Sequence, residues 1–527
     1  MRKAAALLLL LASLLPALLP ADPGRAELIL RQPLTPTRAV ATALADLDNQ
    51  NSVDQPFLRY LYSPALDENL ALALRLHVNL ISREAQLAYP KEVAPGLWRV
   101  DLRDYQWSAK VFDNLANIDP YFHRRQQQEV IEVVFRDVEE FYDQQYGYRD
   151  AYGQWHDTEV RREKRVVRKR IEKRSVIVKN NLYVPNGATS LAGLTLLTQS
   201  QAPIVRADWF LVQSARQISL TNEQTGAGYY DFLELKDRDD YFRLIGQHTN
   251  NKNSKVIIRA VVTVSGISAQ NRQIEQDGCD NGKHWTTLDT FKQKAQGIAI
   301  QTLRAGEFKH DTEEHYAPLP NGLPVTFLCT DQGVRQDSAP DKLGGNRASM
   351  NISADTRIHV NISCIQCHQG AVLMAIADDV RPVYTGRLGV VSNDKNVALE
   401  LRRQYGPGLE IPLNRDREIY QDAFTKTTGQ TSQQTMQTYS GAFSKYAFTQ
   451  VSLEQAAAEL GATPANFLKT LKEAAQRQGA SDFRLDPFLT QPAKDIQRLT
   501  WEDSYSAASD IYYGILPDKQ SEVLKSP

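Results

Sequence analysis

The chain has 527 residues, of which 42% are hydrophobic and 23% are charged, and its formal net charge is -1. This composition is that of an ordinary globular protein, and it excludes the collagen-like, coiled-coil and wholly disordered classes. A charge so close to zero gives the molecule as a whole no electrostatic reason to bind nucleic acid. Only four cysteines occur, which excludes a disulfide framework.

Residues 1–21 have the layout of a secretory signal peptide. The basic residues Arg2 and Lys3 precede an apolar run that ends at Leu19, and the small residue Ala21 follows. The run is shorter than the roughly 20 residues that a membrane-spanning helix needs, so we expect cleavage rather than anchoring. No later segment predicts a transmembrane helix. The mature chain is therefore expected to be periplasmic or otherwise exported.

Residues 22–300 carry mixed signals and are predicted to form an α+β domain. Leucines at helical spacing predict a helix from Ala65 to Leu80, with Ser63 as its N-cap. The stretch from Leu97 to Trp107 begins by alternating apolar and charged residues, as a half-buried strand does. Further along, the β-branched run from Lys255 to Val264 predicts a buried strand.

A charge-dense stretch near residues 124–175 stands inside this domain. Its apolar positions recur at near-helical intervals, so we expect a charged helical insertion. These positions are Val160, Val166, Val167 and Ile171. The basic run from Arg161 to Arg174 has two interpretations: a docking patch for an acidic partner or anionic lipid headgroups, or a solvated helix face.

Residues 301–527 are expected to form a second, mainly α-helical domain. Near its start, the segment Leu319 to Leu323 has the turn chemistry that leads into a strand from Val325 to Leu328, which predicts a β-hairpin. After residue 450, Ser452 with Gln455 forms a capping box at the start of a predicted helical hairpin.

The segment Cys364-Ile365-Gln366-Cys367-His368 has the C-x-x-C-H arrangement of covalent haem attachment. Two cysteines at this spacing lie on one side of a helical turn, where both sulfurs can form thioethers with the porphyrin. The histidine that follows then reaches the iron. We therefore expect one covalent haem c, bound through Cys364 and Cys367, with His368 as the proximal iron ligand. Residues 301–527 are accordingly expected to be a cytochrome c-like haem domain.

Two other interpretations of the motif fit the sequence less well. A thioredoxin-like dithiol requires a strand-to-helix junction, whereas the residues upstream of Cys364 are polar and rich in turn formers. Structural zinc requires a fourth ligand such as His359, which is awkward to place beside so crowded a motif.

The distal ligand of the iron is left open by the residues themselves. Met436 lies at a separation from His368 that is familiar in small cytochromes, yet its surroundings are polar and predict a loop. His310 and His315 flank acidic residues before the predicted hairpin. Met374 is expected to be a core residue.

The two remaining cysteines, Cys279 and Cys329, have two interpretations. In an oxidising compartment they can form a disulfide, or they can be two unrelated buried thiols. A single haem motif also argues against a di-haem peroxidase.

Beyond the haem motif, several segments carry a resemblance to a known family. They are Arg59 to Tyr62, Arg99 to Trp107, Arg206 to Phe210, Tyr229 to Leu235, Ser265 to Arg272, Phe308 to Asp311, Leu319 to Leu323, Gly333 to Pro340 and Asn361 to His368. With them the chain resembles a family of large exported bacterial proteins that have a single C-terminal cytochrome c-type haem motif. The resemblance implies haem binding and a presumed role in electron transfer.

The same resemblance ranks His310 first as the tentative distal ligand. The F-x-H-D segment of the family matches Phe308, His310 and Asp311, but the usual Gly-Gly-Glu that follows is replaced here by Thr312–Glu314. The loss of two glycines puts this ligation in doubt.

Together these features predict an exported c-type cytochrome that transfers electrons. An electron carrier is favoured over an enzyme, and no catalytic residue is predicted. The alternatives are a haem oxidoreductase of peroxidase type with an open distal site, and a haem-linked envelope protein for binding or sensing. The expected partner is a redox protein or a small electron donor or acceptor. Arg381 either pairs with a haem propionate or forms a surface ion pair.

Overall fold

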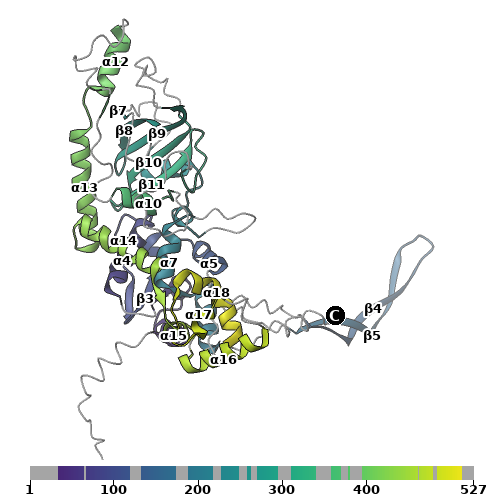
Figure 1. Cartoon of the computed structure of the whole chain (residues 1–527). Coiled ribbons are helices and arrows are strands. Elements are labelled where there is room, and N and C mark those ends of the chain that lie inside the picture. Colours follow the sequence, from purple (N-terminus) through teal and green to yellow (C-terminus); the bar gives the residue numbers. More distant parts are fainter. Residues whose placement is uncertain are drawn as a thin grey trace, which may run out of the picture. The chain divides into compact units, whose positions relative to one another are not determined.

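Figure 1 shows the computed structural model of the chain. It describes residues 34–63, 67–118, 132–173, 188–217, 227–247, 258–262, 270–294, 310–339, 358–368, 378–379, 381, 395–460, 462–478 and 484–512. Helices and strands are both abundant among them, which agrees with the predicted α+β class. No described helix is long and apolar enough to cross a membrane. The predicted signal peptide lies outside the described residues.

The chain divides into two compact units. The larger unit comprises residues 1–123 and 181–527, and the smaller comprises residues 124–180.

The larger unit begins with a four-stranded sheet in the order β2-β3-β1-β6. Its central strand β1 is buried along its whole length, which explains its run of large apolar residues. The strands are β1 (Leu58–Tyr62), β2 (Lys91–Ala94), β3 (Leu97–Asp101) and β6 (Ile204–Arg206). The strand predicted from Leu97 is confirmed as far as Asp101, after which the chain enters the 3-10 helix η2 (Leu102–Tyr105).

Helices cover this sheet and bury apolar side chains against it. They are α3 (Pro36–Asp48), η1 (Gln55–Phe57), α4 (Glu68–Leu80), α5 (Ala109–Ile118), α6 (Ala188–Thr198) and α7 (Ala207–Ala215). The helix predicted over residues 65–80 is α4, but its N-cap is Asp67, whose carboxylate accepts from the amide of Asn69 at 3.0 Å. The expected cap, Ser63, lies before this helix.

A five-stranded antiparallel sheet in the order β11-β10-β9-β8-β7 forms the next part. Its strands are β7 (Ile258–Val262), β8 (Gln270–Cys279), β9 (Gly282–Lys294), β10 (Thr312–Pro318) and β11 (Pro324–Thr330). The predicted hairpin around Leu319 to Leu323 is confirmed, with Gly322 at a φ of 86° in its turn. The sheet takes strands from both sides of residue 300, where the sequence predicts a domain boundary.

Two tyrosines protect the outer edge of this sheet. The amides of Thr326 and Leu328 on β11 donate to the hydroxyls of Tyr229 and Tyr230, at 3.0 and 2.8 Å. Both tyrosines belong to α8 (Tyr229–Phe232), which precedes α9 (Arg238–Ile245). Edge amides of a sheet are otherwise open to pairing with another chain, and here hydroxyl groups satisfy them.

The rest of the larger unit is mainly helical. It contains α10 (Ile362–Cys367), α12 (Lys395–Tyr405), α13 (Glu410–Thr428), α14 (Ser432–Phe448), β12 (Gln450–Val451), α15 (Leu453–Glu459), α16 (Pro464–Gln478), α17 (Asp486–Leu489), β13 (Ile496–Gln497) and α18 (Arg498–Tyr512). The predicted helical hairpin after residue 450 is confirmed as α15 and α16. The Ser452 hydroxyl caps α15 by accepting from the amide of Gln455 at 3.2 Å.

The smaller unit corrects the predicted helical insertion near residues 124–175. Its described residues form two long antiparallel strands, β4 (Glu132–Arg149) and β5 (Trp155–Lys173). Val160 and Val166 are 57% and 64% exposed. Because no core covers these two valines, the near-helical spacing of the apolar residues does not mark a buried helix face.

Oppositely charged residues face each other across the two strands and stabilise their pairing. The register sets Glu140 opposite Arg165 and Asp143 opposite Arg162, and the Arg162 guanidinium lies 5.4 Å from the centre of the Phe141 ring. Cross-strand pairs of this kind stabilise a two-stranded sheet. The basic run from Arg161 therefore begins on a strand that pairs with an acidic one.

Candidate functional site

The C-x-x-C-H motif forms the short helix α10. Asn361 precedes it with a positive φ of 62°, and its side-chain amide donates to the carbonyl of Ala215 at 2.9 Å. This bond fixes the start of the helix to the end of α7. At the other end, the amide of His368 donates to the carbonyl of Cys364 at 2.9 Å, so the histidine closes the last turn.

Cys364 and His368 lie four positions apart and share one side of this turn. Cys364 is 2% exposed and His368 is 9% exposed. The His368 ring lies 4.3 Å from the ring of Tyr316 on β10, and the Tyr420 hydroxyl donates to the His368 carbonyl at 2.8 Å. The thiol and the imidazole are therefore both held against the five-stranded sheet.

The face of the sheet that carries α10 combines an apolar cluster with polar side chains. We call it the motif face; on β10 it comprises Thr312, Glu314 and Tyr316, because alternate residues of a strand point to the same side. An apolar cluster surrounds Cys364 there. Its other members are Ile258, Ala260, Val262, Ile274, Trp285, Tyr316, Leu409 and Leu413.

Buried charged groups lie on the same face, among them Arg272 and Asp289. Arg272 Nε lies 2.7 Å from a carboxylate oxygen of Asp289, with side chains 12% and 2% exposed. Burial raises the pKa of Asp289 although Arg272 opposes that shift. Burial also works against the charge on Arg272, but Asp289 and Glu314 outweigh it and raise the Arg272 pKa. Glu314 in turn places a carboxylate oxygen 3.8 Å from the Cys364 sulfur.

Cys364 and Cys367 on α10, with His368 at its C-cap, are the residues that could hold a covalent haem. A thiol and an imidazole share one helix face, and aromatic and aliphatic side chains of the kind that cover a porphyrin surround the thiol. Cys367 is the last residue of α10, while its side chain lies outside the described residues. Arg381 places its guanidinium against Gly408, next to the cluster residue Leu409.

The structure does not bring His310 to His368. The Nε2 atom of His310 lies 2.9 Å from Oε1 of Glu313. Glu313 and Tyr316 point to opposite faces of the sheet because they stand three positions apart on β10. The described geometry therefore places His310 with Glu313, away from the face that carries His368.

Met436 lies inside a helix rather than in the predicted loop. It is fully buried on α14, in the core cluster that includes Val360 and Ile365. The expectation of polar, loop-like surroundings is wrong because Tyr439 and Phe443 continue the apolar side of α14 one and two turns later. Met374 lies outside the described residues. His359 lies just before α10, where its amide donates to the Ser363 hydroxyl at 3.0 Å.

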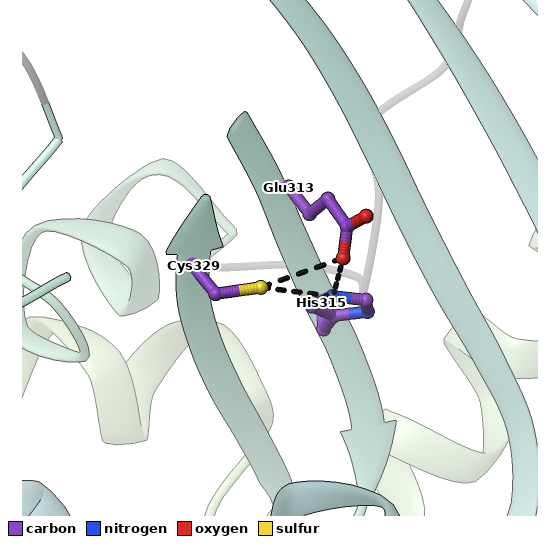
Figure 2. Close-up of side chains that lie close together, drawn as sticks. All are labelled: Glu313, His315 and Cys329. Carbon is purple, nitrogen blue, oxygen red and sulfur yellow. Dashed lines mark hydrogen bonds and ion pairs between the residues drawn. The ribbon is translucent and has the colours of Figure 1, made fainter. Parts of the chain in front are cut away.

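The opposite face of the sheet carries a cluster that the sequence did not predict, shown in Figure 2. We call it the histidine face. Glu313 Oε2 lies 2.9 Å from His315 Nε2 and 3.4 Å from the sulfur of Cys329, and that sulfur lies 3.6 Å from the same imidazole nitrogen. All three side chains are buried.

Further ionisable groups extend the cluster in two directions. His315 Nδ1 lies 3.0 Å from His284 Nε2, and His284 Nδ1 lies 2.7 Å from a carboxylate oxygen of Asp277. On the other side, Arg238 donates to both oxygens of Glu313 at 2.8 and 2.7 Å. A continuous chain of polar contacts therefore runs through the histidine face.

Burial and these contacts shift the pKa values of Glu313, His315 and Cys329 in different directions. Burial lowers the pKa of His315 to about 4. Burial works to raise the pKa of Glu313, but His310, His315 and Arg238 outweigh it and hold that pKa well below its usual range. Burial and the Glu313 carboxylate raise the pKa of the Cys329 thiol. The cluster thus favours an ionised Glu313 beside a protonated thiol.

The predicted alternatives for the cysteines are also resolved. Cys279 and Cys329 are both free, so no disulfide joins them. Glu313 and His315 stand two positions apart just before the predicted hairpin, and that spacing is the sequence signal from which a shared strand face could have been found. The position of Cys329 opposite Glu313 depends on the strand register, which the sequence alone does not specify.

Comparison with protein-family models, with curated proteins and with solved structures finds no match for this chain.

Proposed function

We propose that the chain is an exported c-type cytochrome that carries one covalent haem and transfers electrons. The thiols of Cys364 and Cys367 would hold the porphyrin by adding across its two vinyl groups, and His368 would be the proximal ligand of the iron. When bound, the haem iron supplies one-electron redox chemistry. The resemblance to large exported single-haem proteins forms part of the same proposal, as do a periplasmic location and a C-terminal haem domain.

One observation carries the proposal: Cys364 and His368 are both buried on one side of the turn that α10 forms, and an apolar cluster surrounds Cys364. Such surroundings suit a haem group, because the burial of the haem and its axial ligand set the potential of the iron. Tyr316 packs against the His368 ring, and Tyr420 holds the His368 backbone. These two tyrosines would orient the proximal imidazole.

The test is covalent haem on the mature protein. The full chain is exported in a strain that attaches haem, and its intact mass and its haem stain after denaturing electrophoresis are measured. We expect the mass of one haem on the chain cleaved after Ala21. The Cys364→Ala/Cys367→Ala variant should lose the haem, whereas the Cys279→Ser control should keep it. A colourless wild-type protein with the bare polypeptide mass overturns the proposal.

A haem oxidoreductase with an open distal site is the second candidate. The contact between His310 and Glu313 favours it, because this contact engages the distal ligand ranked first by the sequence. Absorption of the reduced protein with and without carbon monoxide separates the two. An unchanged spectrum supports an electron carrier, and a large shift supports an open site. Comparison of His310→Ala with Met436→Ala then identifies any distal ligand.

A further inference from the structure

The cluster on the histidine face has the donors and spacing of a metal centre. We propose that Glu313, His315 and Cys329 bind a zinc ion at a site separate from the haem motif. The three donors come from neighbouring strands, since Glu313 pairs directly with Cys329 and His315 follows two positions later on β10. Donors fixed on paired strands hold a metal more precisely than donors on loops.

The distances between the donor atoms are close to those of a tetrahedral zinc site. With zinc to sulfur at about 2.3 Å and zinc to nitrogen or oxygen at about 2.0–2.2 Å, a tetrahedral ion holds its sulfur about 3.5 Å from each lighter donor. The Cys329 sulfur lies 3.6 Å from His315 Nε2 and 3.4 Å from Glu313 Oε2. Only the 2.9 Å separation of that nitrogen and that oxygen has to widen, by roughly 0.4 Å.

The chemistry of the donors selects the ion. Calcium and magnesium prefer oxygen ligands, whereas a thiolate with an imidazole and a carboxylate is a zinc donor set. When zinc binds, Cys329 releases its thiol proton to solvent, and the thiolate and the Glu313 carboxylate then supply two negative charges to the divalent cation. Three protein ligands leave one coordination position, and His310 brings a further imidazole to the other oxygen of Glu313, at 2.9 Å.

The groups behind His315 already orient it as a metal ligand. In the zinc-bound protein the ion replaces the proton between His315 Nε2 and Glu313; His284 can then donate its Nδ1 proton to Asp277 and accept the Nδ1 proton of His315, so two neutral imidazoles satisfy both contacts. The Nε2 lone pair of His315 then faces Glu313 and Cys329, where the ion would lie. Metal-bound histidines are commonly held through their second nitrogen in this way.

The position of Arg238 sets a condition on this site. Its guanidinium contacts both oxygens of Glu313, so the ion must displace it from Oε2 while Oε1 remains its partner. The Arg238 side chain is 28% exposed, and it can therefore move toward solvent at small cost. An ion that failed to displace it would leave the cluster as a hydrogen-bonded network only.

Zinc content and zinc X-ray absorption test the site on the full mature protein, kept reduced and equilibrated with zinc. We expect one zinc per chain with a single sulfur among its nearest neighbours. Cys329→Ser should remove the sulfur and weaken zinc binding by about 100-fold or more, judged against the 10–100-fold effects of second-shell changes. Cys279→Ser is the matched control, because Cys279 is a free thiol on β8 of the same sheet, and it should bind zinc like the wild type.

A second variant keeps the test decisive if Cys329→Ser does not fold. Glu313→Gln preserves the shape of the side chain and should also lose zinc. The proposal is overturned if the wild type binds no zinc, if its zinc has no sulfur neighbour, or if the folded variants bind zinc unchanged. Haem is measured in the same samples by mass and absorption, so a failure of the zinc site is distinguished from a failure of haem attachment.

Discussion

The two faces of the five-stranded sheet bury their polar groups in different ways. The motif face is apolar around α10 and holds one concentrated ion pair, Arg272 with Asp289, whose side chains are 12% and 2% exposed. The histidine face distributes its charge along a chain that includes Asp277, His284 and Glu313. Alternate residues of the single strand β10 belong to the two faces.

The difference shows how neighbouring residues of one strand acquire different environments. An isolated buried charge is costly unless a partner neutralises it and hydrogen bonds satisfy it. On the motif face Asp289 depends mainly on Arg272, whereas on the histidine face Glu313 has several partners. The loss of one partner should therefore matter more on the motif face.

The largest expected effect is the loss of Arg272. Arg272→Met leaves Asp289 buried beside Glu314 without its cation, which should lower the free energy of unfolding by about 3–5 kcal/mol. Arg238→Met should cost only about 1–2 kcal/mol, because Glu313 keeps His310 and His315 as partners. Urea unfolding of the mature protein measures both.

A double variant provides the control for this comparison. Arg272→Met/Asp289→Asn removes both charges and should recover much of the lost stability, since a replaced pair is tolerated better than a broken one. Equal losses in the two single variants would contradict the contrast between the faces.

His77 extends the comparison to a buried histidine with neutral partners. The Tyr439 and Ser214 hydroxyls lie 2.9 and 2.7 Å from its two ring nitrogens, and burial lowers its pKa to about 3. Between pH 6.5 and about 3 the unfolded chain binds a proton here that the folded chain does not. This residue should therefore cost stability as the pH falls, by up to about 1.4 kcal/mol per pH unit.

Substitution of His77 isolates this contribution. His77→Gln should lose less stability than the wild type between pH 6.5 and 4.5, while the difference between the two proteins stays constant from pH 7.5 to 8.5. Unfolding free energies across both pH ranges give the slopes. Parallel slopes on the acid side would show that His77 is protonated in the folded protein and would contradict its neutral burial.

The sequence predicts features whose causes are local. The turn from Leu319 to Leu323 and the cap at Ser452 contain their own signals, and both are confirmed. The haem motif is equally local, and its role stays a prediction. The cluster of Glu313, His315 and Cys329 was not predicted because its carboxylate, histidine and thiol meet only through the pairing of β10 with β11.

The β4–β5 hairpin was misread for the opposite reason. Amphipathic spacing predicts structure because one side of an element is buried, but Val160 and Val166 are exposed on this hairpin. Its structure depends on cross-strand pairing, such as Glu140 with Arg165, across the turn that separates the two strands. Complementary charge on the two adjacent segments, rather than the spacing of apolar residues, was the signal that could have predicted this hairpin.

The smallest expected effect lies in this hairpin, which contrasts with the buried pairs of the sheet. The carboxylate of Glu140 lies 3.3 Å from the Arg165 guanidinium, with side chains 28% and 58% exposed. The coupling between them should be about 0.2–1 kcal/mol, because water and salt screen an exposed pair. Hydrogen exchange of the hairpin amides in Glu140→Ala, Arg165→Ala and the double variant measures it, and the swapped variant Glu140→Arg/Arg165→Glu should retain it. We expect this coupling to be smaller than that of Arg272 with Asp289 and to disappear in 1 M salt. If it is as large, or if it persists in salt, then burial is not what makes an ion pair stabilise this protein.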